Sequence, residues 1–96
     1  DFNKSLEINP RDTQAYLDRG NIHRVNGQHD QAISDFNKAL EINPRDGQAY
    51  SNRGRAYYFK KEYKDSWNDF KKAQELGYQI PTEFLDDLRR ASGKGN

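Results

Sequence analysis

Two histidines and three carboxylates are the residues of this chain whose side chains are best suited to catalysis or metal binding. His23 and His29 could act as general bases or zinc ligands, and Asp86 and Asp87 with Glu62 could form an acid–base pair. Adjacent helical residues point apart, however, and a metal site needs several converging ligands. The sequence has no cysteine and no nucleotide-binding, serine-hydrolase or zinc-protease motif. We therefore expect no catalytic residue, no metal, no cofactor and no enzymatic activity.

The elements that position these residues repeat along the chain with a period of 34 residues, from Asp1 to Asp35. Segment 1–12 recurs at 35–46 with one substitution. Such periods are typical of arrays in which each repeat stacks on its neighbours. Segment 1–12 lacks a helix start, so we expect the natural N-terminus to lie upstream. The expected units are the second helix of a truncated repeat over 1–12, repeats over 13–46 and 47–80, and a capping helix with a tail over 81–96.

The histidines follow the same period. Tyr57 and Tyr63 stand one period after His23 and His29. The histidines therefore occupy packing positions of the repeat, whereas catalysis needs a constellation of groups that occurs once.

The pattern predicts two helices in each repeat. Pro10 and Pro44 lack an N–H group and disfavour the helical region for the preceding residue, so a helix ends before each of them. Asp12 and Asp46 are placed to cap the next helix, and Gly27 marks the break between the two helices of the first repeat. No segment has a strand pattern. The predicted fold class is all-α.

The second helix of the first repeat begins near Asp30 and has one apolar face. We expect Gln31, Asp35 and Lys38 to face water. A similar stripe in the second repeat ends at Gly77. The expected core residues of these two helices are Ala32, Ile33, Phe36, Leu40, Trp67, Phe70, Ala73 and Leu76.

Fixed residue types occupy fixed steps of both repeats. They are Tyr16, Gly20, His23, Ala32, Phe36 and Pro44, and then Tyr50, Gly54, Tyr57, Ser66, Phe70 and Ala73. This pattern resembles the tetratricopeptide-repeat family. It departs from the family at Arg19 and Arg53, where the family has Leu, and at Tyr78, which stands one period after Pro44. The resemblance implies a right-handed superhelical solenoid of antiparallel helix pairs.

Two glycines are expected to set the distance between paired helices. Gly20 and Gly54 have no side chain, so the helices of a repeat can approach closely there. We expect the small residues Ala32 and Ser66 to face them.

A last amphipathic helix is predicted from Pro81, because proline is tolerated in the first turn of a helix. We expect Phe84, Leu85 and Leu88 to form its apolar edge. The helix is expected to end at Gly93, before a loose tail over 94–96.

The resemblance implies a protein–protein interaction scaffold. In the family, the first helices of successive repeats line a concave groove that holds a peptide or a partner helix. Several of these positions differ between the two repeats although the framework is nearly identical, for example Leu17 against Ser51. The alternative is that they simply face solvent and vary freely. The groove residues so implied are Gln14, Leu17, Asn21, Arg24, Val25, Gln48, Ser51, Asn52, Arg55, Tyr58 and Phe59, with Thr82, Leu85 and Arg89 from the cap.

The predicted ligand is an acidic peptide. Arg24, Arg55 and Arg89 would form a cationic column, and the planar guanidinium group of arginine suits carboxylates. Tyr58 and Phe59 would anchor the interface. The carboxylate clamp that some family members use is not expected, because Leu17, Thr82 and Asp86 stand where it needs basic residues.

Two other functions stay open. The chain could be a structural spacer that self-assembles, since Phe2 and Leu6 of the N-terminal half repeat lack the first helix that would cover them. A helical-repeat RNA binder is disfavoured because 16 basic and 15 acidic residues leave a net charge of only +1. No apolar run approaches the length of a membrane span. The compartment stays open, with a weak preference for the cytoplasm.

Overall fold

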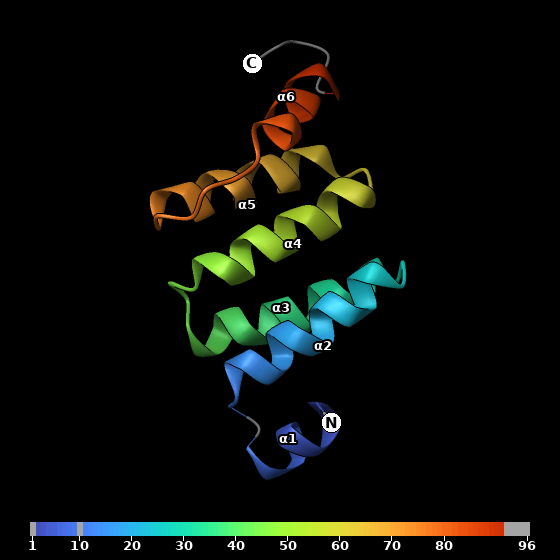
Figure 1. The fold of residues 1–96 in the computed structure, drawn as a ribbon, viewed down its shortest axis with the longest axis vertical. Coiled ribbons are helices and arrows are strands. Elements are labelled where there is room, and N and C mark those ends of the chain that lie inside the picture. The colour runs from blue at the N-terminus through green and yellow to red at the C-terminus, as the bar shows by residue number, and fades with distance from the viewer. Residues whose placement is uncertain (1, 10, 92–96) are drawn as a thin grey trace.

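The computed structural model describes residues 2–9 and 11–91, and these residues form six helices (Figure 1). No strand occurs among them, which confirms the all-α prediction. Pro10, the expected helix end at Gly93 and the tail over 94–96 lie outside the described residues. The helices are α1 (Phe2–Ile8), α2 (Thr13–Val25), α3 (His29–Ile42), α4 (Gly47–Phe59), α5 (Tyr63–Glu75) and α6 (Thr82–Ala91).

The helices stack along the long axis of an elongated body of 47 × 26 × 17 Å. α2 pairs with α3, α4 pairs with α5, and α3 packs against α4 to join the two pairs. α1 and α6 lie at opposite ends of the stack (Figure 1). This arrangement is the solenoid of antiparallel helix pairs that the sequence predicted.

Caps and left-handed residues delimit the helices as predicted. The side chains of Asp12 and Asp46 each accept a hydrogen bond from the backbone N–H three residues later, at 3.1 and 3.2 Å. Gly27 and Gly77 follow helix ends with φ of +80° and +94°. Lys61 stands one period after Gly27 and takes the same left-handed conformation, with φ 69°. The repeat therefore fixes the turn geometry even where glycine is absent.

Gly20 allows close helix approach in the first repeat, as predicted. A Cβ atom placed there would lie 2.6 Å from Cε1 of Phe36, which is fully buried. The side chain that fills this space is the large Phe36, and the small Ala32, which was expected to face the glycine, is fully buried in the core.

Gly54 has the same role in the second repeat. A Cβ atom there would lie 2.8 Å from the ring of Phe70 and 3.3 Å from Cβ of Asp69. Ser66 faces this glycine through a hydrogen bond, since its Oγ donates to the carbonyl oxygen of Gly54 at 2.7 Å. Close approach is therefore built from a glycine, a phenylalanine and, in the second repeat, a buried hydroxyl.

The expected apolar stripes of α3 and α5 supply nearly half of the buried apolar residues among those the structure describes. Trp67 and Leu76 are only half-buried, because they lie at the margins of the α5 stripe. The residues that are buried as expected are Ala32, Ile33, Phe36, Leu40, Phe70 and Ala73.

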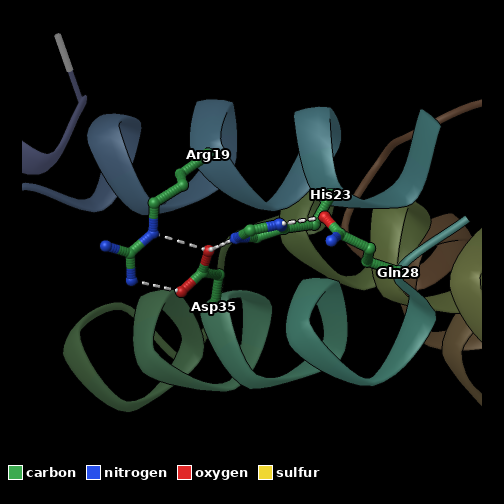
Figure 2. A network of polar contacts seen from close by, with 4 residues as sticks. All are labelled: Arg19, His23, Gln28 and Asp35. Atoms are coloured by element: carbon green, nitrogen blue, oxygen red, sulfur yellow. Dashed lines mark hydrogen bonds and ion pairs between the residues drawn. The ribbon is translucent and has the colours of Figure 1, made fainter. Parts of the chain in front are cut away.

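Asp35 is buried, so the prediction that it faces water was wrong, whereas Gln31 and Lys38 are exposed. Arg19 reaches Asp35 from α2 and donates from Nε to Oδ2 at 2.9 Å and from Nη2 to Oδ1 at 2.6 Å (Figure 2). A buried carboxylate is stable only when paired, and the arginine in the family's Leu position supplies the partner.

The second repeat has the same ion pair with an added link to the first. Arg53 binds both carboxylate oxygens of Asp69, each at 2.8 Å. Its Nη1 also donates to Oδ1 of Asn37 on α3 at 2.8 Å. Arg53 therefore contacts its own repeat and the preceding one.

α6 caps the stack through its apolar edge, as predicted. Leu88 is buried, and Phe84 and Leu85 are half-buried against α4 and α5. The ring of Tyr58 on α4 meets Phe84 edge-on at 5.2 Å, and its hydroxyl donates to Oδ2 of Asp87 at 2.8 Å. Tyr58 therefore helps to hold α6 in place.

Candidate functional site

The first helices of the two repeats, α2 and α4, form one continuous surface with the following helix α6. We name this surface the first-helix face. α2 contacts α4 directly. Arg55 of α4 lies with its guanidinium carbon 5.2 Å from the ring centre of Phe84 on α6. Side chains from all three helices are therefore within reach of a single extended ligand.

Two of the sequence-predicted groove residues are not on this surface. Leu17 is 2% exposed and Ser51 is 7% exposed, so both side chains belong to the core and cannot contact a ligand. They stand at the same position of the repeat, on the side of the first helix that packs against neighbouring helices. The remaining groove residues are accessible: Gln14, Val25, Phe59, Thr82 and Arg89 are exposed, and Asn21, Arg24, Gln48, Asn52, Arg55, Tyr58 and Leu85 are half-buried.

Two donors on α4 have no acceptor. Nδ2 of Asn52 and Nε of Arg55 are buried and make no hydrogen bond within the part of the chain that the structure describes. The two residues are three apart on one helix, so they lie on the same side. An unsatisfied buried donor costs about 1–3 kcal/mol. Both atoms are covered by the protein's own atoms, so a ligand would reach them only if these side chains moved.

The positive charges of Arg24 and Arg55 are close together and uncompensated. Burial lowers the pKa of Arg24 below its ordinary value, and the charge of Arg55 lowers it further. Over residues 2–9 and 11–91, neither arginine forms an ion pair with a carboxylate, and Arg24 donates only a long hydrogen bond of 3.4 Å to Asn21. The face therefore favours an anionic group at this point.

Arg89, the third arginine of the predicted column, differs from the other two. Its Nη1 donates to Oδ1 of Asp86, one turn earlier on α6, at 3.1 Å. The neighbouring Arg90 is paired in the same way with Asp87. Carboxylates on α6 thus offset much of the positive charge at this end of the face.

His23 contacts residues of its own repeat, and His29 contacts the second repeat. Nδ1 of His23 lies 2.9 Å from Oε1 of Gln28, and its Nε2 lies 3.8 Å from Oδ2 of Asp35 (Figure 2). His29 stacks on Phe59 with ring centres 6.4 Å apart. Within the described residues, no group of three or more histidines, aspartates and glutamates is arranged to hold a metal ion.

None of the described helices combines the length with the hydropathy that a bilayer crossing requires.

Models of the tetratricopeptide repeat match residues 13–46 and 36–75 of the chain. A comparison with curated proteins found no match. Among solved structures, the chain resembles YrrB, described as a TPR protein with an unusual peptide-binding site, with 25% identity and a TM-score of 0.89 over 97% of this chain and 49% of that one. The chain thus spans about half the length of YrrB.

A second similar structure is the first TPR of Spaghetti (RPAP3), bound to the HSP90 peptide SRMEEVD. The identity is 24% and the TM-score is 0.83, and the alignment covers 96% of this chain and 72% of that one. At this identity the likeness supports the fold alone.

Proposed function

The chain belongs to the tetratricopeptide-repeat family, and from this premise we propose that its first-helix face binds an extended or helical segment of a partner protein. The observation that carries the proposal is the pair of cations Arg24 and Arg55, which lie close together on this face without a carboxylate partner within the described residues. Carboxylates of a peptide would supply that partner. YrrB, whose description names a peptide-binding site, supports the same class of ligand.

The preferred segment is acidic. Arg24 and Arg55 repel each other, and a carboxylate between them would replace that repulsion with two attractions. Charge-assisted hydrogen bonds to arginine are about twice as strong as neutral ones. Because the face is open to solvent, raising the salt concentration should weaken this part of the affinity.

The proposed role is that of a scaffold, without catalysis. The polar groups gathered at the centre of the face are amide and guanidinium groups, from Asn21, Arg24, Asn52 and Arg55. Such groups bind and orient anions, but they provide neither a nucleophile nor a general base.

Peptide display across a proteome, followed by calorimetry on the best peptide, tests this function. Arg55→Gln should weaken binding by about tenfold, because it removes one charge-assisted contact worth about 1.4 kcal/mol. The matched control is Lys72→Gln, an exposed cation on α5 that lies off the first-helix face. If the control loses as much affinity as Arg55→Gln, or if no peptide is enriched, the proposed function is wrong.

A self-assembling role has one observation in its favour. Ile22 on α2 is 47% exposed, whereas Ala56, one period later on α4, is fully buried. The side of α2 that bears Ile22 therefore offers apolar surface that a second chain could cover.

A further inference from the structure

A shallow cavity of about 400 Å³ opens where α2 ends and α3 begins, beside the last turn of α4. Two of its lining residues are large exposed apolar side chains, with Val25 75% exposed and Phe59 53% exposed. Isolated exposed apolar residues are common, but two that line one cavity form a surface able to bind an apolar group. The lining residues are Arg24, Val25, Gly27, His29 and Phe59.

The apolar part of this cavity is held in place by its neighbours. The ring of His29 lies nearly parallel to that of Phe59, with 14° between their planes. Tyr58 also meets Phe59 edge-on, with ring centres 5.1 Å apart. Phe59 thus contacts two other rings, and a ligand that binds against it would lose little side-chain freedom of Phe59.

The polar part of the cavity is a cation. Arg24 lines the cavity, and the charge of Arg55 acts on it from α4. Lys60, the residue that directly follows α4, is already paired with Asp30 and Glu62, each at 2.9 Å. Positive charge without a carboxylate partner within the described residues is therefore found beside the apolar surface, at the rim formed by Arg24 and Arg55.

We propose that this cavity is a specificity pocket that takes an apolar side chain of an extended bound peptide, while the carboxylate of an Asp or Glu two residues further along that peptide binds Arg24 and Arg55. The pocket rests on the proposed function, because it defines which peptides the first-helix face selects. In an extended peptide, side chains two residues apart lie on the same face, about 7 Å from each other, which matches an apolar surface and a cation that line the same cavity. Apolar burial and charge pairing would then act together.

Four synthetic peptides in a common Gly-Ser frame, with Leu-Ser-Glu, Ser-Ser-Glu, Leu-Ser-Gln or Ser-Ser-Gln at the centre, test the pocket by titration into the labelled protein under NMR. The Leu-Ser-Glu peptide should shift the amide signals of Val25, Gly27, His29 and Phe59, and should bind about tenfold more tightly than either single change. Arg24→Gln should remove the preference for Glu over Gln, and Phe59→Ser the preference for Leu over Ser.

Lys72→Gln, on α5, is the control and should leave both preferences intact. Because Val25 is more exposed than Phe59, Val25→Ser provides a second apolar variant that is independent of the stacking on His29. Unchanged spectra with millimolar Leu-Ser-Glu peptide, or equal binding of all four peptides, would overturn the pocket. If display-selected peptides then still shift signals at Gln14 and Gln48, the first-helix face binds peptides and only the pocket is refuted; if they shift no signal on the face, the proposed function fails as well.

Discussion

Arg53 holds Asp69 through two parallel hydrogen bonds of 2.8 Å, and Arg19 holds Asp35 in the same way one repeat earlier. Burial raises the pKa of Asp69, and the contact with Arg53 opposes that rise. The hydrogen bonds to Asp69 raise the pKa of Arg53, so the guanidinium group stays charged. Each repeat thus contains one buried carboxylate that depends on a single arginine.

Arg53→Ala should lower the free energy of unfolding by about 3 kcal/mol, because Asp69 would remain buried without its partner. Urea denaturation followed by circular dichroism measures the change. The paired change Arg53→Leu with Asp69→Leu removes both charges and should recover most of the loss. If the single variant is no less stable than Lys72→Ala, which breaks only an exposed pair with Glu75, the ion pair is not important for folding.

Gly54→Val should cost about 1–3 kcal/mol, since its side chain would overlap the ring of the fully buried Phe70. Gly47→Ala is the matched comparison. Its Cβ would lie 2.5 Å from the ring of Tyr78, but that ring is 43% exposed and can rotate away. Thermal melts should therefore show a large loss at Gly54 and a small one at Gly47. Equal losses would mean that the glycine–phenylalanine contact is not the constraint.

Lys61→Gly should stabilise the protein by about 1 kcal/mol, because Lys61 has a left-handed backbone conformation that glycine adopts without strain. The reverse change at the equivalent position, Gly27→Lys, should destabilise by a similar amount. Chemical denaturation of both variants measures the effect. A neutral result in both would show that the turn adjusts its φ at little cost.

The chain should self-associate at high concentration through the exposed apolar side of α2. Ile22→Asp should reduce the association without a change in helical content, because the side chain is half exposed. Analytical ultracentrifugation of the protein and the variant tests this. Phe59→Asp is the control, since it alters an apolar residue at the cavity instead. A monomer at millimolar concentration would exclude the self-assembling role.

Tyr58→Phe should lower stability by about 1 kcal/mol at neutral pH through loss of the hydrogen bond to Asp87. That hydrogen bond, with some burial, raises the pKa of Tyr58 above its ordinary value of 10.0. The stabilisation should therefore be complete below about pH 10 and be lost as the pH rises through the folded-state pKa. Urea midpoints of the protein and the variant should converge at high pH. A constant difference would contradict the role of the proton.

The sequence was sufficient to predict the helix pairs, because their signals are local. Caps such as Asp12, breaks such as Gly27 and the apolar stripe of α3 need no knowledge of distant contacts. The period then extended these signals to the whole stack.

The local pattern could not predict which side chains on different helices form ion pairs. Asp35 stands between Ser34 and Phe36 in the sequence, and its burial depends on Arg19, sixteen residues away on another helix. The departure of Arg19 and Arg53 from the family's Leu was the one available signal, since two arginines facing a core require two carboxylates.

The same reason explains the mixed outcome for the site. Leu17 and Ser51 were assigned to the groove because the family resemblance places them on the concave side of the first helices, yet the helix rotation that buries them is set by tertiary packing. The cavity joins α2, α3 and α4, so Gly27 and His29 entered it only once those helices were placed. Whether the accessible groove residues bind a peptide stays a prediction.

The hydrogen bond from Arg53 to Asn37 has a consequence for how the molecule unfolds. If the α2–α3 pair opened alone, Arg53 would lose an acceptor, and the hold on Asp69 in the intact pair would loosen with it. Neighbouring repeats therefore share part of their free energy, and breaking one raises the probability that the next one breaks. Denaturation should accordingly proceed as a single cooperative transition and not as two independent steps.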